Sequence, residues 1–344
     1  MLSRKYLLYN KDNFIKGGPN VYKKGNIVYG AFARHNDGKK TLGELIHDWN
    51  YEVNYVYNSE TTWRYNENLQ RHILQFFTGR KPLKELDTSE ITEYLLYLRT
   101  EKQFSNNTVN KHRTHLMTLF EFAVQNDERY GIPINPVRKI RPLRHEPYAY
   151  KIYSPEEAKH MMSILRDTEN VILESAAALA LYCGCRREEA CGLRWENVNL
   201  RKEELMITEV RTVAGKEVVH HNYTKNNTIQ TVGIPAALHS ILVRLKKSQR
   251  EIPCEYVLSG KDGKPLHPSK ISMQWHAFLQ KNNLPLIRFH DLRHTNLSLL
   301  MSKMSAVDVA KIGGHAKVST TTNIYGHSFT DTVERGRAVI NHLL

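Results

Sequence analysis

Residues with side chains that could bind a phosphate or carry a proton gather in the last third of the sequence. His290 and Arg293 are three positions apart, so on a helix they share one face and place an imidazole beside a cation that can grip two phosphate oxygens. His315 follows two glycines, where a left-handed turn would carry its imidazole back towards that pair. Tyr325 comes ten residues later. Singly, such residues are usually solvated or half-buried, but the joint spacing predicts a phosphate-binding site beside a tyrosine hydroxyl.

A second group of candidates lies upstream. Arg186 and Glu189 follow an expected apolar helix over 171–182, and the carboxylate can orient the guanidinium while leaving its other edge for a phosphate. A surface ion pair of little energetic weight is the alternative. Lys225 falls at an expected turn and can reach a ligand there, although a lysine in a turn is usually only solvated.

The helices and strands expected around these residues form two groups. Helices are expected over 41–49 and 61–77, from a cap at Thr88 or Ser89, and from Ser105 to about 127, which makes a four-helix domain. A capping box at 154–157 opens a second domain, in which 205–235 has a period of two and predicts a three-stranded antiparallel meander. The fold class is therefore mainly α with a small antiparallel β-sheet, in other words α+β.

Chain length indicates the number of domains, and net charge indicates the kind of partner. The 344 residues suit two domains, and 49 Lys plus Arg against 35 Asp plus Glu give a net charge of +14, which favours nucleic acid. No run reaches the roughly 18 apolar residues of a membrane span, so a cytoplasmic, nucleoid-associated protein without a membrane partner is expected. The four cysteines lack metal-ligand spacing, so we expect no metal site.

Three basic segments are candidate DNA contacts. Residues 1–40 carry nine Lys or Arg against two Asp, and 20–34 reads either as a short hairpin or as part of a disordered basic tail. The helix from Ser105 has a polar, basic first half, and an extended basic stretch follows it, which would suit a strap joining two domains around a duplex. Ordinary solvated surfaces are the alternative. The candidate DNA-binding residues are Asn110, Lys111, Arg113, Thr114, Arg138, Lys139 and Arg141.

These motifs together resemble the tyrosine recombinases, also called phage integrases. The likeness covers 154–344, and 184–195 matches the segment that bears the family's first catalytic arginine. The resemblance implies a catalytic set of Arg186, Lys225, His290, Arg293, His315 and the nucleophile Tyr325, with Glu189 in support. Gly313 stands where leucine is commoner, and Asn226 where threonine is frequent; neither change removes a chemical group.

The resemblance also implies a domain plan. Residues 1–40 look faintly like an arm-binding module, 41–130 look like a helical core-binding domain, and 131–153 are a basic linker. Residues 154–327 form a mixed α/β catalytic domain. Residues 328–344 place apolar side chains on one helical face, and the resemblance favours packing of this helix in trans within a DNA-bound tetramer; packing on its own domain is the alternative.

The chemistry predicted is strand exchange through a 3′-phosphotyrosine. The arginines would neutralise the transition state, Lys225 would protonate the leaving 5′ oxygen, and the histidines would manage the proton of Tyr325. No Walker A pattern occurs, and the catalytic set lacks the paired carboxylates of two-metal nucleases, so no cofactor is expected. The function expected is that of a mobile-element integrase, and the expected partner is double-stranded DNA at recombination sites.

The resemblance further implies a dimer on each site, a homotetramer on paired sites, and an excisionase or host DNA-bending factor as a candidate further partner. A chromosome-dimer resolvase and a type IB topoisomerase are the alternatives within this chemistry. A DNA-binding module without chemistry would tolerate losses among the six positions, and a metal-dependent nuclease would need a carboxylate cluster.

Overall fold

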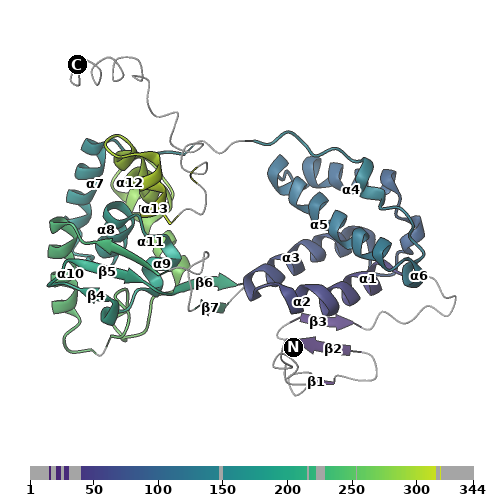
Figure 1. Cartoon of the computed structure of the whole chain (residues 1–344), viewed down its shortest axis with the longest axis horizontal. Helices are drawn as coiled ribbons and strands as arrows, with labels where there is room; N and C mark the ends of the chain where they lie inside the picture. The colour runs from purple at the N-terminus through teal and green to yellow at the C-terminus, as the bar shows by residue number, and fades with distance from the viewer. Residues whose placement is uncertain are drawn as a thin grey trace, which may run out of the picture. The chain divides into compact units, whose positions relative to one another are not determined.

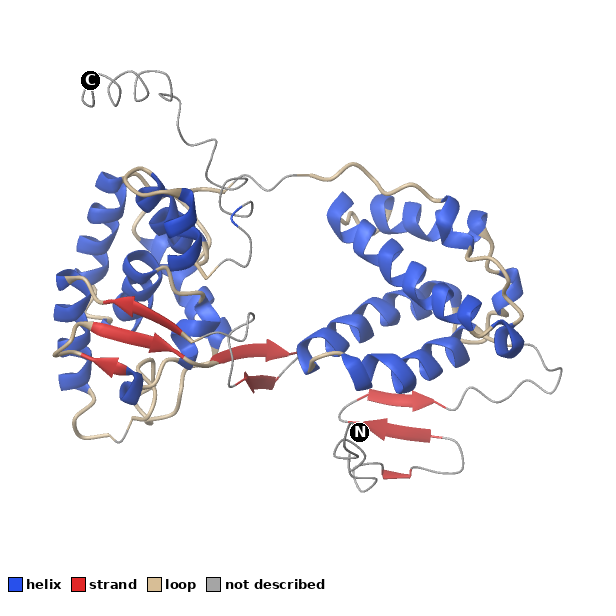
Figure 2. Cartoon of the chain, in the orientation of Figure 1, coloured by secondary structure: helices blue, strands red, loops and turns tan. Residues whose placement is uncertain are grey.

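The chain divides into two compact units, Met1–Pro147 and Tyr148–Leu344 (Figure 1). The computed structural model describes residues 40–146, 150–214, 217–221, 229–252, 254–314 and 318, and the backbone of three short N-terminal strands. Within the described residues most of both units is helical, and the strands form small antiparallel sheets (Figure 2). The expected α+β class is confirmed.

The N-terminal strands form one antiparallel sheet. It comprises β1 Ile15–Lys16, β2 Val21–Lys24 and β3 Ile27–Gly30. Val21 lies opposite Gly30 and Lys24 opposite Ile27, so the short hairpin that the alternating pattern suggested is present. Whether this sheet binds arm-type sites stays a prediction.

Long amphipathic helices build the rest of the first unit: α1 Leu42–Trp49, α3 Glu60–Phe77, α4 Thr88–Thr100 and α5 Asn106–Gln125. Their apolar faces meet in a core that includes Leu45, Ile73, Tyr94 and Phe120. Short turns complete the unit: α2 Tyr55–Tyr57, η3 Leu83–Glu85, α6 Asp127–Tyr130 and η4 Pro136–Lys139.

Capping residues set where these helices begin. Thr41 and Glu44 form the capping box of α1, and the Ser105 hydroxyl accepts the Thr108 amide at the start of α5, as expected. The expected cap of α4 is wrong by one or two residues, because the Asp87 carboxylate, and not Thr88 or Ser89, accepts the Glu90 amide at 2.9 Å.

A π-helical turn, η2 Asn50–Asn54, continues α1 and carries buried amides that the sequence reading missed. Asn50 and Gln70 exchange hydrogen bonds of 2.8 and 3.0 Å, and Asn54 donates to Asn50 Oδ1 at 2.9 Å. These bonds satisfy polar groups that would otherwise be costly to bury between η2 and α3.

The second unit is built around α8 Val171–Cys183, which is buried along most of its length. It packs against α7 Pro155–Asp167, α10 Ala236–Ser248, α11 Pro268–Lys281 and α12 Asp291–Met301. Shorter helices complete the unit: α9 Arg187–Gly192, η5 Trp195–Asn197 and α13 Ala306–Ile312. The expected capping box of Ser154 and Glu157 opens α7.

The strands of this unit do not form the expected meander. β5 Glu204–Ile207 pairs with β4 Val198–Asn199 and with β8 Gln230–Gly233. Among the described strands, β6 Val210–Ala214 and β7 Glu217–His221 pair only with each other. The physical reason is packing: Leu205 and Ile207 of β5 are buried in the core, while β6 packs on α9 and α11. The period of two identified the strands but assigned wrong partners to them.

Candidate active site and DNA-contact residues

The turn between α8 and α9 presents the first candidate arginine. Gly184 ends α8 in the left-handed region at φ +65°, and Arg186 then occupies the N-cap position of α9. Glu189 accepts the Arg186 backbone amide at 2.7 Å through one oxygen and the Arg186 guanidinium at 2.5 Å through the other. The predicted contact is present, and the carboxylate, only 2% exposed, fixes both the backbone and the side chain of Arg186.

Arg293 lies deeper than the sequence indicated. Its side chain on α12 is 2% exposed, and its two terminal nitrogens donate to the carbonyl oxygens of Gly184 and Gly313. Glu189 Oε2 lies 3.9 Å from its Nη1, so one buried carboxylate faces both candidate arginines. Arg293 therefore joins the α8–α9 turn to the end of α13. Both partners are too distant in the sequence for residue spacing to predict these contacts.

His290 takes the N-cap position of α12, and Arg293 lies in the first turn of the same helix. The two residues therefore lie together at the start of one helix, as their spacing predicted. Burial is the main cause that holds the pKa of His290 below its usual value, and the positive charge of Arg293 is the second. At neutral pH the imidazole is therefore uncharged and can accept a proton, which refines the proton-carrying role given to it from the sequence.

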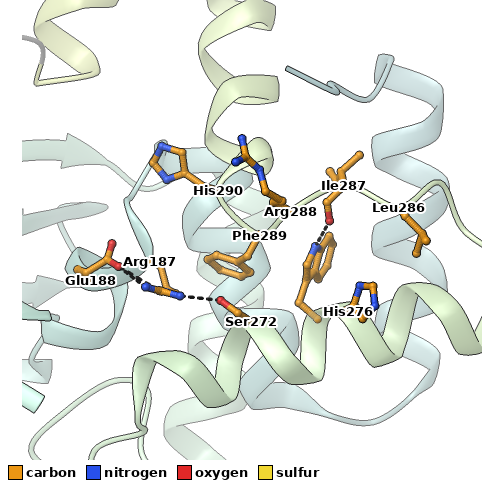
Figure 3. Close-up of a pocket in the computed structure, with 10 residues that line it drawn as sticks. Arg187, Glu188, Ser272, His276, Leu286, Ile287, Arg288, Phe289 and His290 are labelled. Carbon is orange, nitrogen blue, oxygen red and sulfur yellow. Dashed lines mark hydrogen bonds and ion pairs between the residues drawn. The ribbon is translucent and has the colours of Figure 1, made fainter. Parts of the chain in front are cut away.

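A hollow of about 610 Å³ adjoins His290 between α9, α11 and the segment before α12 (Figure 3). Arg187 lies in its wall, donating to Ser272 Oγ at 2.8 Å and pairing with Glu188 at 2.6 Å. The Arg288 amide donates to Asp291 at 2.9 Å, which fixes the chain entering α12. Sequence reasoning missed Arg187 and Ser272, because nothing in their local spacing connects positions 187 and 272.

The glycines before His315 adopt the predicted left-handed turn at Gly314, with φ +56°. A Cβ on Gly314 would lie 3.9 Å from Arg186 Nη1, so the chain leading to His315 begins beside the first arginine. Lys225, His315 and Tyr325 themselves, and the expected helix over 328–344, lie outside the described residues. Arg186, Glu189, His290 and Arg293 are thus the candidates that the structure places together.

The candidate DNA contacts of the first unit fall into two classes. Asn110 exchanges two hydrogen bonds of 2.8 Å with the backbone of Leu143, and Arg113 Nε donates to the Ile140 carbonyl at 2.7 Å. These two side chains hold the basic stretch 138–146 along α5, a role that the sequence did not suggest. Lys111 and Thr114 on the same helix remain exposed.

The basic stretch itself presents cations to solvent. Lys139 and Arg141 are exposed, whereas Arg138 pairs with Glu121 at 2.8 Å. Lys111 and Thr114 also line a hollow of about 680 Å³ beside Tyr65 and the buried His115. The candidates best placed to meet a phosphate backbone are therefore Lys111, Thr114, Lys139 and Arg141.

Among the described residues, no three His, Cys, Asp or Glu side chains are grouped as metal ligands would be. In the same part of the chain, no helix is both long and apolar enough to cross a bilayer.

Profiles of known families match both units. The profile of the phage integrase family matches residues 151–331, and that of the phage integrase N-terminal SAM-like domain matches residues 50–128. The chain is 24% identical to a tyrosine recombinase XerC-like protein of Caldanaerobacter subterraneus subsp. tengcongensis, over 92% of this chain and 95% of the relative. It is 27% identical to the ICEBs1 integrase of Bacillus subtilis, over 76% of this chain and 72% of that protein.

Solved structures share the fold. The Tn1549 transposon integrase in complex with a circular intermediate DNA superposes with a TM-score of 0.74 at 18% identity, covering 89% of this chain and all of that chain. A lambda integrase tetramer bound to a Holliday junction gives a TM-score of 0.64 at 17% identity, covering 84% of this chain and 78% of that one.

Proposed function

The chain belongs to the phage integrase family of tyrosine recombinases, enzymes that cleave and rejoin DNA strands, and we propose from this premise that it acts through Tyr325 as the integrase of a mobile element. The observation that carries the proposal is the pairing of Arg186 and Arg293 around the buried Glu189. Two oriented guanidinium groups suit the two non-bridging oxygens of one phosphate.

Cleavage begins when the Tyr325 oxygen attacks the scissile phosphorus. A free phenol has a pKa of about 10, so the attack needs a proton acceptor. His290, which is neutral, and His315 are the acceptors we assign. Arg186 and Arg293 neutralise the charge that grows on the phosphoryl oxygens.

The leaving 5′ oxygen needs a proton as the bond to phosphorus breaks, and we assign that proton to Lys225. The product is a 3′-phosphotyrosine and a free 5′ hydroxyl. Because the phosphodiester energy is kept in the covalent bond, a 5′ hydroxyl of another strand can reverse the step and join new partners without ATP. No metal or other cofactor enters this scheme.

DNA is the proposed partner, held by residues 41–130 and by the catalytic region 154–327. Relatives of the same fold were solved with a circular intermediate DNA and, as a tetramer, with a Holliday junction. By analogy we propose one dimer per site, a tetramer on paired sites, and the helix over 328–344 packing in trans. An excisionase or a host DNA-bending factor would set the direction of the reaction.

The test is incubation of the protein in EDTA with a nicked suicide duplex carrying the ends of its element, followed by a denaturing gel. We expect a slow band linked to the 3′ end, which is absent for Tyr325→Phe, since phenylalanine keeps the ring but has no nucleophilic oxygen. Cleavage that leaves a 5′ phosphate, or that needs Mg²⁺, would contradict the proposal. Transfer to a second duplex separates an integrase from a topoisomerase, which rejoins the same strand.

A further inference from the structure

A ring of polar side chains ties the loop after α9 to the β6–β7 hairpin. Glu209, directly before β6, is 8% exposed, and its Oε1 accepts Arg194 Nε at 2.5 Å. Its Oε2 lies 3.3 Å from Nε2 of His220 on β7. The Tyr256 hydroxyl accepts Arg194 Nη2 at 2.8 Å and lies 3.2 Å from the same His220 nitrogen. The ring thus connects three segments that are distant in sequence.

Opposite charges meet in this ring. The bond to Glu209 raises the pKa of Arg194, so this arginine stays a cation facing the carboxylate. Arg194 and Arg211 both lie over the Tyr256 ring, at 4.7 and 5.3 Å from its centroid, and Arg211 Nη1 donates to the Leu266 carbonyl at 2.8 Å. Arg194 also pairs with the exposed carboxylate of Glu255, so removing the Glu209 charge would take away its buried partner and leave only the exposed one.

The backbone reinforces the same junction. A Cβ on Gly192, the last residue of α9, would lie 2.7 Å from the Glu209 carbonyl oxygen, a distance that real Cβ atoms do not adopt. The Trp195 amide donates to the Glu255 carbonyl at 3.0 Å. The hairpin is consequently held in register with α9, the helix that Arg186 opens.

The hairpin leads into the segment that contains Lys225. β7 ends at His221, next to the ring member His220, and β8 begins at Gln230. At the start of β8, the Gln230 side chain donates to the Ile312 carbonyl, just before the glycines that precede His315. The described residues on either side of the segment are therefore fixed to elements of the candidate active site, although Lys225 itself lies outside the described residues.

We propose that Glu209 and His220 are positioning residues for Lys225. By fixing the end of β7 relative to α9, they fix where the lysine segment departs relative to Arg186. The inference rests on the general-acid role proposed for Lys225. It predicts a defect confined to protonation of the leaving group, with attack by Tyr325 left intact.

A sulfur substrate isolates that step. In a duplex with a 5′-bridging phosphorothiolate, the Tyr325 oxygen bonds to phosphorus as the phosphorus–sulfur bond breaks, and the sulfur leaves with the electron pair as a thiolate. A thiol has a pKa of about 8.5, far below that of an alcohol, so the thiolate leaves without a proton donor. Loss of a positioned general acid then slows cleavage of the oxygen substrate only.

The experiment compares single-turnover cleavage of matched oxygen and sulfur suicide duplexes by the full-length protein. Glu209→Gln keeps the side-chain size and removes the charge, and His220→Gln removes the imidazole from the ring. We expect both variants to cleave the oxygen duplex about tenfold more slowly than the parent and the sulfur duplex within about twofold of it, since general acids contribute 10²–10⁴-fold and only part is lost. Glu204→Gln on β5, an exposed position outside the ring, should match the parent on both.

The outcomes separate the two proposals. Equal slowing of both substrates, which misfolding or displacement of Arg186 would also produce, overturns the positioning role, as does normal cleavage of both. Lys225→Ala is the reference: its own defect should be larger and should also be relieved by sulfur. If sulfur does not relieve Lys225→Ala, the proposed general acid is wrong; if it relieves Lys225→Ala but neither ring variant, only the positioning inference fails.

Discussion

Glu189 serves two arginines with one buried carboxylate. Both of its oxygens are bonded to Arg186, and one of them also faces Arg293. The residue types and the spacing of three predicted the Arg186 contact, because helical periodicity puts such residues together. The carbonyl partners of Arg293 could not be predicted, since Gly184 lies 109 residues away and meets Arg293 only through the packing of α8 on α12.

Glu189→Gln should impair catalysis more than DNA binding. The amide keeps one acceptor but loses the charge that faces both guanidinium groups, so their orientation at the phosphate is relaxed. We expect covalent-complex formation to fall about 10–100-fold, the range typical of residues that orient functional ligands. Rates on the suicide duplex measure this, with binding measured separately. Glu196→Gln, an exposed change on η5, is the control, and an unaltered cleavage rate in Glu189→Gln would refute the role.

His115 should make the protein sensitive to mild acid. Burial lowers its pKa to about 4, whereas the unfolded chain titrates near 6.5. Its contribution to stability is therefore complete above about pH 6.5 and is lost as the pH falls towards 4, because the unfolded state binds the proton first. The cost between pH 7 and pH 5 is about 2 kcal/mol.

Urea unfolding of the full-length protein at pH 7 and pH 5 tests this. His115→Phe, which keeps a ring against Trp49, should lose less stability between the two values than the parent does. His160→Phe on α7 is the control, because that histidine is exposed. Equal losses in the parent and His115→Phe would mean that His115 does not govern the acid response.

At the scale of elements, α5 does more than fill the core. Its amide side chains hold the basic stretch by its backbone: Asn106 donates to the Arg144 carbonyl, and Asn107 exchanges bonds with Glu146. A polar helix face that reads as a DNA contact is therefore partly an anchor for the polypeptide that follows it. Composition alone cannot separate these roles, because asparagine bonds a peptide group as readily as a phosphate or a base.

Asn110→Ala should release this stretch. The change removes both hydrogen bonds to Leu143, each worth about 1 kcal/mol, so local opening should increase about tenfold or more. Trypsin cleavage after Arg144, followed under native conditions, reports that opening. Thr114→Ala, at an exposed position of the same helix, should leave the rate unchanged. Identical cleavage rates for both variants would show that Asn110 is not an anchor.

Capped, amphipathic elements were predictable and strand partners were not. Thr41, Ser105 and Ser154 mark helix starts through local hydrogen bonds, which the local sequence encodes. The partner of β5 depends on the burial of β5 in the core and on the packing of β6 against α9, and β8 lies more than twenty residues downstream. The π-helical turn at Asn50–Asn54 likewise depends on Gln70 of another helix.

At the scale of the whole molecule, the charge of +14 should make DNA affinity steeply dependent on salt. Lys139→Ala and Arg141→Ala should each reduce the slope of log affinity against log salt by about 0.9 if each cation meets one phosphate. Arg138→Ala should change the slope less, because Arg138 is already paired with Glu121. Titrations at several salt concentrations measure this, and unchanged slopes in all three variants would place the phosphate contacts elsewhere.

The contact between Gly192 and Glu209 also bears on protein engineering. Because the helix and the hairpin touch through bare backbone, neither can be exchanged for its counterpart from a relative without matching the other to within a few tenths of an ångström. Chimaeras between family members should therefore place their junctions outside residues 184–234 and transplant that interval as one cassette. A junction inside this interval would join the helix of one protein to the hairpin of another, and their backbones would not match at the contact.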